Sequence, residues 1–191
     1  MMKLLLSLLV LVPVCYGDYA EFCHQMPCPE YTVVETNQAF EKREYVATKW
    51  ITTTMPGNAS SDFLAANERL KGFWMSQKEA GKEIPDTWPV LITSTDGTNG
   101  FIQSLSWFLP PGPEPQIADP SVYLLRKSAS TIYVKSFGGV PSVRASQESR
   151  DALKNYLTTN EITYNPQITT AVFYDSYFAF SHHNEVWFYA A

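Results

Sequence analysis

The sequence predicts an α+β domain in which an antiparallel sheet carries two helices. Two segments have helical periodicity, and each is preceded and followed by a pair of runs rich in β-branched and aromatic residues. This strand–strand–helix–strand–strand order occurs twice, and such an order is typical of the α+β class. The halves share little sequence identity, so the duplication is inferred from the order of elements.

The first half begins with β-rich runs and continues into an amphipathic helix. Strands are expected at residues 31–35, 40–45, 47–54, 90–95 and 101–109. Between them, residues 62–79 have apolar side chains at helical spacing, which predicts one helix with an apolar face. Ser61 is expected to cap its N-terminus, with Asp62 favourable in the first turn.

The second half repeats the pattern after a proline-rich crossing segment at residues 110–120. Strands are expected at residues 121–126, 131–137, 169–174 and 185–189. Small and apolar side chains from Ala145 to Leu157 recur at helical spacing and predict the second helix.

The N-terminus has the pattern of a cleavable signal peptide over residues 1–17. Lys3 provides the positive charge, residues 4–14 are mostly apolar, and Cys15 and Gly17 suit the cleavage site. A bilayer-spanning helix needs about 20 apolar residues, which makes the alternative, an uncleaved anchor, less favourable. We therefore expect a secreted, extracellular protein without a membrane span, with an irregular arm at residues 18–30 and one domain at residues 31–191.

Two features fit an oxidising compartment. Cys23 and Cys28 remain after cleavage and are expected to form one disulfide. A metal site with His24 is the alternative, although a zinc site requires four ligands. Asn58 begins a glycosylation sequon after a Pro-Gly turn, so we expect a glycoprotein.

Charge and motif content exclude several classes of function. The chain carries a net charge of −5, and an acidic protein repels nucleic acid and anionic membranes. A nucleophile elbow, a phosphate-binding loop and the zinc-protease motif are all missing from the sequence. We therefore expect no enzymatic activity; an enzyme with an unrecognised site is the remaining alternative.

Several short motifs occur in an order that resembles one known family. They are FEKREY at residues 40–45, KWITT at 49–53, WPV at 88–90, YVKSFGG at 133–139 and NEVW at 184–187. In order and spacing they resemble the SOUL haem-binding protein family, over roughly residues 31–189. The resemblance implies a distorted antiparallel β-barrel with two helices, built by duplication, that binds haem or another porphyrin.

The resemblance also suggests which residues would hold a tetrapyrrole. An apolar slot is expected from Phe63, Leu70, Phe73 and Trp74 on the first helix, together with Phe178 and Phe180. Arg69 and Lys71 are candidates for the two propionates. An aromatic stripe at helical spacing is also typical of a packed core, and we favour the core for Phe63 and Leu70 and the pocket for Trp74.

Axial ligation of the iron has weaker support from the residue types. Glu44 stands where some relatives have a histidine, and a carboxylate is a poor substitute for imidazole. His182 and His183 are the remaining candidate ligands, in a loop before the last strand. We therefore expect haem to be held by apolar contact and a few cations.

The sequence therefore predicts a secreted protein that binds a hydrophobic small molecule and has no enzymatic activity. Haem or another tetrapyrrole is the favoured ligand. The alternative is a protein–protein interaction module whose apolar groove accepts a partner helix or loop. The orientation of Phe178 and Phe180 discriminates between them. Inward side chains that continue the surface of Trp74 favour a pocket, whereas outward side chains in a patch favour a protein partner.

Overall fold

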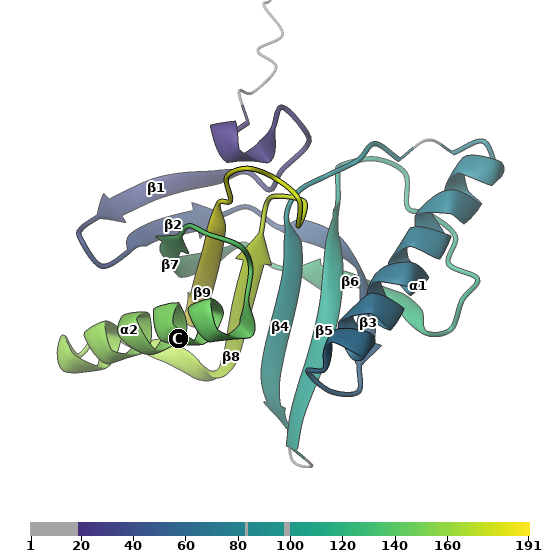
Figure 1. Cartoon of the computed structure of the whole chain (residues 1–191). Coiled ribbons are helices and arrows are strands. Elements are labelled where there is room, and N and C mark those ends of the chain that lie inside the picture. The colour runs from purple at the N-terminus through teal and green to yellow at the C-terminus, as the bar shows by residue number, and fades with distance from the viewer. Residues whose placement is uncertain (1–18, 83, 98–99) are drawn as a thin grey trace, which may run out of the picture.

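The computed structural model describes residues 19–82, 84–97 and 100–191, so the predicted signal peptide lies outside the described residues. These described residues form two α-helices, one short 3-10 helix and nine strands, arranged as Figure 1 shows. The elements are η1 Glu21–Cys23, β1 Tyr31–Thr36, β2 Glu41–Tyr45, β3 Thr48–Met55, α1 Ser60–Glu79, β4 Val90–Gly97, β5 Gly100–Leu109, β6 Val122–Lys127, β7 Ser130–Phe137, α2 Val143–Thr159, β8 Tyr164–Phe173 and β9 Asn184–Ala190. The α+β class and the predicted order of elements are confirmed.

The strands form one antiparallel sheet whose pairing has internal symmetry. The order is β1-β2-β7-β9-β8-β4-β5-β3-β6. If β2, β3, β4 and β5 are exchanged with β6, β7, β8 and β9, every pairing except β1 with β2 maps onto an observed pairing, and β4 with β8 maps onto itself. The two halves are therefore interleaved copies of one unit, with β1 added at an edge.

The barrel that the family resemblance implied is not found. Within the part of the chain that the structure describes, β1 and β6 are edge strands and no ladder joins them. Closure requires every edge to pair, so the sheet is open, although it is strongly curved (Figure 1).

Each helix covers one half of the outer face of the sheet (Figure 1). Side chains alternate between the two faces of a strand, and the outward ones meet the apolar stripe of a helix. On α1, Ala66, Leu70 and Phe73 pack with Ile51 and Leu105 of the sheet. A second cluster joins α2 to β7 and β9 through Tyr133, Leu153, Leu157, Val186 and Phe188.

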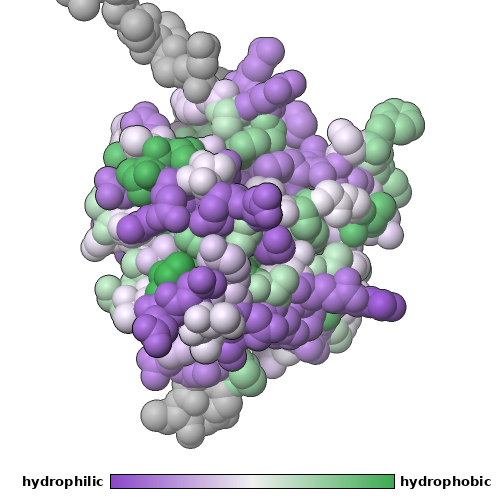
Figure 2. Space-filling model, turned by 90° about the vertical axis from the view of Figure 1, so that its left-hand side faces the viewer, coloured by the Kyte–Doolittle hydropathy of each residue, from purple (hydrophilic) through white to green (hydrophobic). Residues whose placement is uncertain are grey.

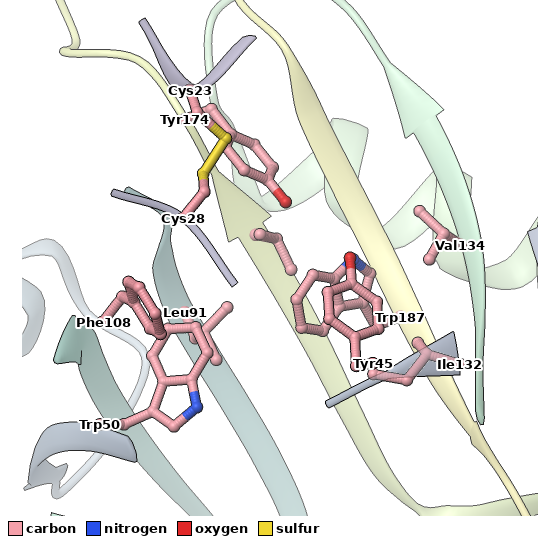
Figure 3. Packing of buried hydrophobic residues seen from close by; sticks show 11 residues of the cluster. Cys23, Cys28, Tyr45, Trp50, Leu91, Phe108, Ile132, Val134, Tyr174 and Trp187 are labelled. Carbon is pink, nitrogen blue, oxygen red and sulfur yellow. A yellow bond between two sulfur atoms is a disulfide. The ribbon is translucent and has the colours of Figure 1, made fainter. Parts of the chain in front are cut away.

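The inner face of the sheet curls around a third apolar cluster (Figure 3). Trp50 on β3 and Trp187 on β9 belong to this cluster although their strands are far apart in the sheet order. The N-terminal arm adds Cys23 and Cys28, which lie over the inner face. The arm therefore forms part of the hydrophobic core.

The helix boundaries follow local capping with one correction. The predicted cap at Ser61 is wrong, because α1 already begins at Ser60 and its N-cap is Ala59. The Asp62 carboxylate accepts a hydrogen bond from the Ala59 N–H at 3.2 Å, which satisfies a donor that the helix leaves unpaired. In α2, the Ser142 hydroxyl accepts from the Ala145 N–H at 3.1 Å.

Neither helix described by the structure is long and apolar enough to cross a bilayer.

Candidate functional site

The apolar face of α1, predicted to line a slot, lies against the sheet. Leu70 is fully buried and Phe73 nearly so, in the cluster that joins α1 to β3 and β5. Phe63 and Trp74 are partly buried at its margin. Trp74 packs edge-to-face on Phe73 and on Trp107, with ring centroids 5.4 Å and 5.3 Å apart. Sheet side chains therefore occupy the space in which a flat ligand was expected.

The two predicted propionate partners point to different sides of α1. Residues two apart on a helix are separated by about 200° around its axis. Arg69 donates to the Thr53 hydroxyl and to the Thr54 carbonyl, both at 2.8 Å, beside a shallow depression of about 430 Å³. Lys71 instead pairs loosely with Glu68 at 3.8 Å on the exposed side. The structure does not bring the two cations together.

The loop between β8 and β9 carries three exposed aromatic side chains. Tyr177 is 66% exposed, Phe178 is 90% exposed and Phe180 is fully exposed. By contrast, the side of the molecule that carries β1 and α2 is mostly hydrophilic and its apolar areas are small (Figure 2). Because of their exposure, Phe178 and Phe180 point outward, and neither belongs to the apolar cluster that includes Trp74.

The two candidate metal ligands have different surroundings. His183 Nε2 lies 2.8 Å from a Glu185 oxygen, and the His183 ring stacks on Phe22 with centroids 4.1 Å apart. His182 Nε2 is buried and has no hydrogen-bond partner among the described residues. In residues 19–82, 84–97 and 100–191, no three His, Cys, Asp or Glu side chains converge as a metal site would require.

The structure joins Cys23 to Cys28 in a disulfide, as predicted. Asn58 is exposed in the turn between β3 and α1, where a glycan would have room. Glu44 is also exposed, on the side of β2 opposite to the buried Arg43.

A buried cluster of charged and polar side chains lies under the arm, and the sequence did not reveal it. Its centre is Glu185, which is fully buried on β9. One carboxylate oxygen contacts Arg43 Nη1 at 3.0 Å and His183 Nε2 at 2.8 Å. The other accepts from the Tyr174 hydroxyl at 3.1 Å and from Trp187 Nε1 at 2.7 Å. We call Arg43, Tyr174, His183, Glu185 and Trp187 the Glu185 cluster.

The contacts in this cluster keep Glu185 ionised. Burial alone would raise the pKa of this carboxyl, but the hydrogen bond from His183 and the charge of Arg43 outweigh burial and lower it. An ionised carboxylate only accepts hydrogen bonds, so His183 Nε2 carries the proton. Burial raises the pKa of Tyr174 well above its ordinary value, and the charge of Glu185 adds to the effect.

A signal for this cluster was present in the strand pattern. Glu185 shares the inner face of β9 with Trp187, and Arg43 shares the inner face of β2 with Tyr45. Two opposite charges at core-facing positions predict a buried pair, since an unpaired buried charge is very costly.

A depression of about 470 Å³ lies between the arm and β1. Phe22, the disulfide, Glu30, Tyr31 and Tyr174 are among its lining residues. Beneath it, the Arg43 guanidinium lies 4.4 Å from the centroid of the Tyr31 ring, within the range of a cation–π contact. The depression therefore has aromatic walls, and Arg43 lies buried behind the Tyr31 ring without lining it.

Fold and site together define a curved-sheet α+β domain with a plugged inner face and an exposed aromatic loop. Residues 26–189 match the family described as SOUL heme-binding protein, and the chain belongs to this family. The chain is 27% identical to heme-binding protein 2 of Mus musculus over 157 residues, which cover 78% of this chain and 77% of the relative.

Solved structures resemble the fold at much lower identity. A protein from Listeria innocua described as a hydrolase superposes with a TM-score of 0.56 at 9% identity, covering 83% of this chain and 94% of that one. A second hydrolase from Listeria innocua gives 0.51 at 7% identity, covering 78% and 90%. At such identities the likeness concerns the fold alone.

Proposed function

We propose that this protein binds a hydrophobic small molecule, with haem or another tetrapyrrole as the first candidate, and that it acts without catalysis. The observation that carries the proposal is the family match over residues 26–189. The name of the mouse relative supports haem as the ligand.

The exposed aromatic loop supports a location for this ligand. Phe178 and Phe180 present apolar rings to solvent. A planar macrocycle would cover these rings, and the burial would stabilise the complex by about 25 cal/mol per Å² of apolar surface. His182 lies two residues beyond Phe180 and is the remaining candidate for an iron contact, but its Nε2 is buried and reaches a haem on this surface only if the loop rearranges. The donor types fit haem, but apolar contact provides most of the affinity.

Haemin titration followed in the visible spectrum tests the proposal. We expect saturable binding by the intact protein. The double substitution Phe178→Ala and Phe180→Ala should weaken it at least about tenfold, because burial of one such ring contributes about 1.5–3 kcal/mol. Phe101→Ala is the matched control, since Phe101 is 76% exposed on the β4–β5 hairpin.

The axial contribution is tested by His182→Ala in the same titration. We expect a small spectral change and an affinity near that of the intact protein. Loss of the bound spectrum would show that strong ligation by His182 holds the haem. An intact protein whose addition leaves the haemin spectrum unchanged would exclude haem as the ligand.

A protein–protein interaction module is the second candidate function. The outward orientation of Phe178 and Phe180 favours it, because exposed aromatic residues are enriched at protein interfaces. The double variant Phe178→Ala and Phe180→Ala separates the two functions. If the loop binds a protein, the variant loses the partner complex, and neither the intact protein nor the variant changes the haemin spectrum.

We also propose that the protein is secreted. The disulfide supports an oxidising compartment, and the exposed sequon supports passage through a glycosylating one. In eukaryotic expression, we expect the secreted protein to carry a glycan on Asn58 and to shift in gel mobility after endoglycosidase treatment. Asn58→Gln should migrate like the treated protein. A secreted wild-type protein whose mobility does not change on treatment would contradict the prediction.

A further inference from the structure

We propose that the inner face beneath the N-terminal arm is a second binding site, which takes small uncharged planar aromatic molecules and is opened by reduction of the Cys23–Cys28 disulfide. This inference goes beyond the proposed haem surface around Phe178 and Phe180. In the oxidised protein, the ring of Phe22 occupies the site.

The contacts of Phe22 define a slot for a flat ring. The Phe22 ring stacks on the His183 ring at 4.1 Å with an interplanar angle of 4°. It also meets Tyr174 edge-on, with centroids 4.6 Å apart, and the Arg43 guanidinium lies 5.9 Å from its centroid. Stacked and edge-to-face contacts of this kind are those that select aromatic rings.

The walls of the slot do not depend on the arm. His183, Tyr174 and Arg43 each contact the Glu185 carboxylate, at 2.8, 3.1 and 3.0 Å. Arg43 lies in β2 and Glu185 in β9, and Tyr174 and His183 are the two ends of the loop between β8 and β9. Phe22 lies in η1. When the arm lifts, the walls therefore stay in place and the slot is empty.

Charge near the slot favours an uncharged ligand. Arg43 is compensated by Glu41 at 2.8 Å and by Glu185 at 3.0 Å, and Glu30 adds a carboxylate at the rim. An anion, including a tetrapyrrole with two propionates, would meet this surplus of carboxylates. A cation in place of the Phe22 ring would instead approach the Arg43 guanidinium, which lies 5.9 Å from the centroid of that ring.

The disulfide holds the arm in a conformation that its backbone disfavours. Within the loop that it closes, His24 and Gln25 have φ of 54° and 62°, in the left-handed region that residues with a Cβ avoid. The other arm contacts include His24 Nε2 to Asp175 at 2.9 Å and the Trp88 N–H to the Pro27 carbonyl at 3.2 Å. Breaking the disulfide releases the two strained residues and loosens the arm.

Cys23 and Cys28 border the depression but are only 1% and 6% exposed, so a reductant reaches the sulfurs when the arm opens locally. A dithiol attacks one sulfur as its thiolate and forms a mixed disulfide. Its second thiol then closes a cyclic disulfide and releases both cysteines as thiols. Two electrons and two protons pass from the dithiol to the protein.

The test uses N-phenyl-1-naphthylamine, an uncharged aromatic probe whose fluorescence rises in apolar surroundings. All proteins carry Phe178→Ser and Phe180→Ser, which removes the surface proposed for haem. We expect little signal from the oxidised protein, and a several-fold rise with saturation at one probe per chain after reduction with dithiothreitol. Phe22→Ala should bind the probe while oxidised, and Phe22→Tyr should stay closed.

Circular dichroism and thermal unfolding are measured on the same samples. Probe binding by folded, oxidised Phe22→Ala supports the slot, and probe binding by the folded, reduced parent supports its opening. Unchanged fluorescence in both would overturn the site. A rise that appears only with loss of the near-ultraviolet signal would overturn it too, because the probe would then report unfolding. Equal binding by Phe22→Ala and Phe22→Tyr would show that Phe22 does not fill the slot.

Discussion

Replacing Glu185 with Ala is expected to lower the free energy of unfolding by about 3–5 kcal/mol, because it leaves a buried charge without its partner. Arg43 is 2% exposed and keeps only the half-exposed Glu41 as a carboxylate partner. The Tyr174 hydroxyl and Trp187 Nε1 also lose their acceptor. Urea unfolding followed by tryptophan fluorescence measures the change.

Glu44→Ala is the matched control for this substitution. Glu44 lies next to Arg43 on β2 but is exposed, and surface changes of this kind stay within about 0.5 kcal/mol. In addition, Arg43→Met combined with Glu185→Leu should recover part of the loss, since apolar replacement of a buried pair removes both charges. Equal effects of Glu185→Ala and Glu44→Ala would show that the Glu185 cluster contributes nothing to folding.

Acidification should reduce the stabilisation by Glu185. Its pKa in the folded protein is below the ordinary value of 4.5, because the His183 and Arg43 contacts outweigh burial. The unfolded chain therefore binds a proton at a pH where the folded protein does not. The stability difference between the wild type and Glu185→Gln is full above pH 4.5 and decreases as the pH falls toward the folded value. A difference that grows on acidification would contradict the assignment.

The order of elements was predictable because it depends on local patterns. The periodicity of residues 62–79 predicted α1, which extends over Ser60–Glu79. Strand pairing was not predictable in the same way, because β2 pairs with β7 and β3 with β6 through contacts between distant segments. Whether such a sheet closes depends on its curvature and edges, which explains why the expected barrel proved to be an open sheet.

The candidate site was less predictable because its residues meet only through that pairing. Arg43 and Glu185 each lie in a motif that carried the family resemblance, but β7 separates their strands in the sheet. The orientation of Phe178 and Phe180 was equally hidden, since a loop without periodicity does not show which side chains face inward. Apolar residues are usually buried, and these two are exposed.

Leu70→Ala is expected to destabilise the protein by about 2–5 kcal/mol, through lost apolar burial and the cavity that remains. Leu70 is fully buried between α1 and the sheet, in one cluster with Ile51 and Leu105. Neighbours held by strand pairing have little freedom to collapse into the space. In a chain of this size, each kcal/mol lowers Tm by about 2–4 °C, so thermal unfolding shows the effect clearly.

Leu64→Ala provides the same chemical change on the same helix, but Leu64 is 60% exposed. We expect it to alter the free energy of unfolding by no more than about 0.5 kcal/mol. Haemin titration of both variants adds a second readout, because a core residue affects folding while a residue that lines an open pocket affects binding. A Leu70→Ala protein with unchanged Tm and weakened haemin binding would reopen the face of α1 as the ligand slot. If Leu70→Ala loses stability but keeps its haemin affinity, the ligand binds elsewhere. This is the outcome we expect if haem binds at the exposed loop that carries Phe178 and Phe180.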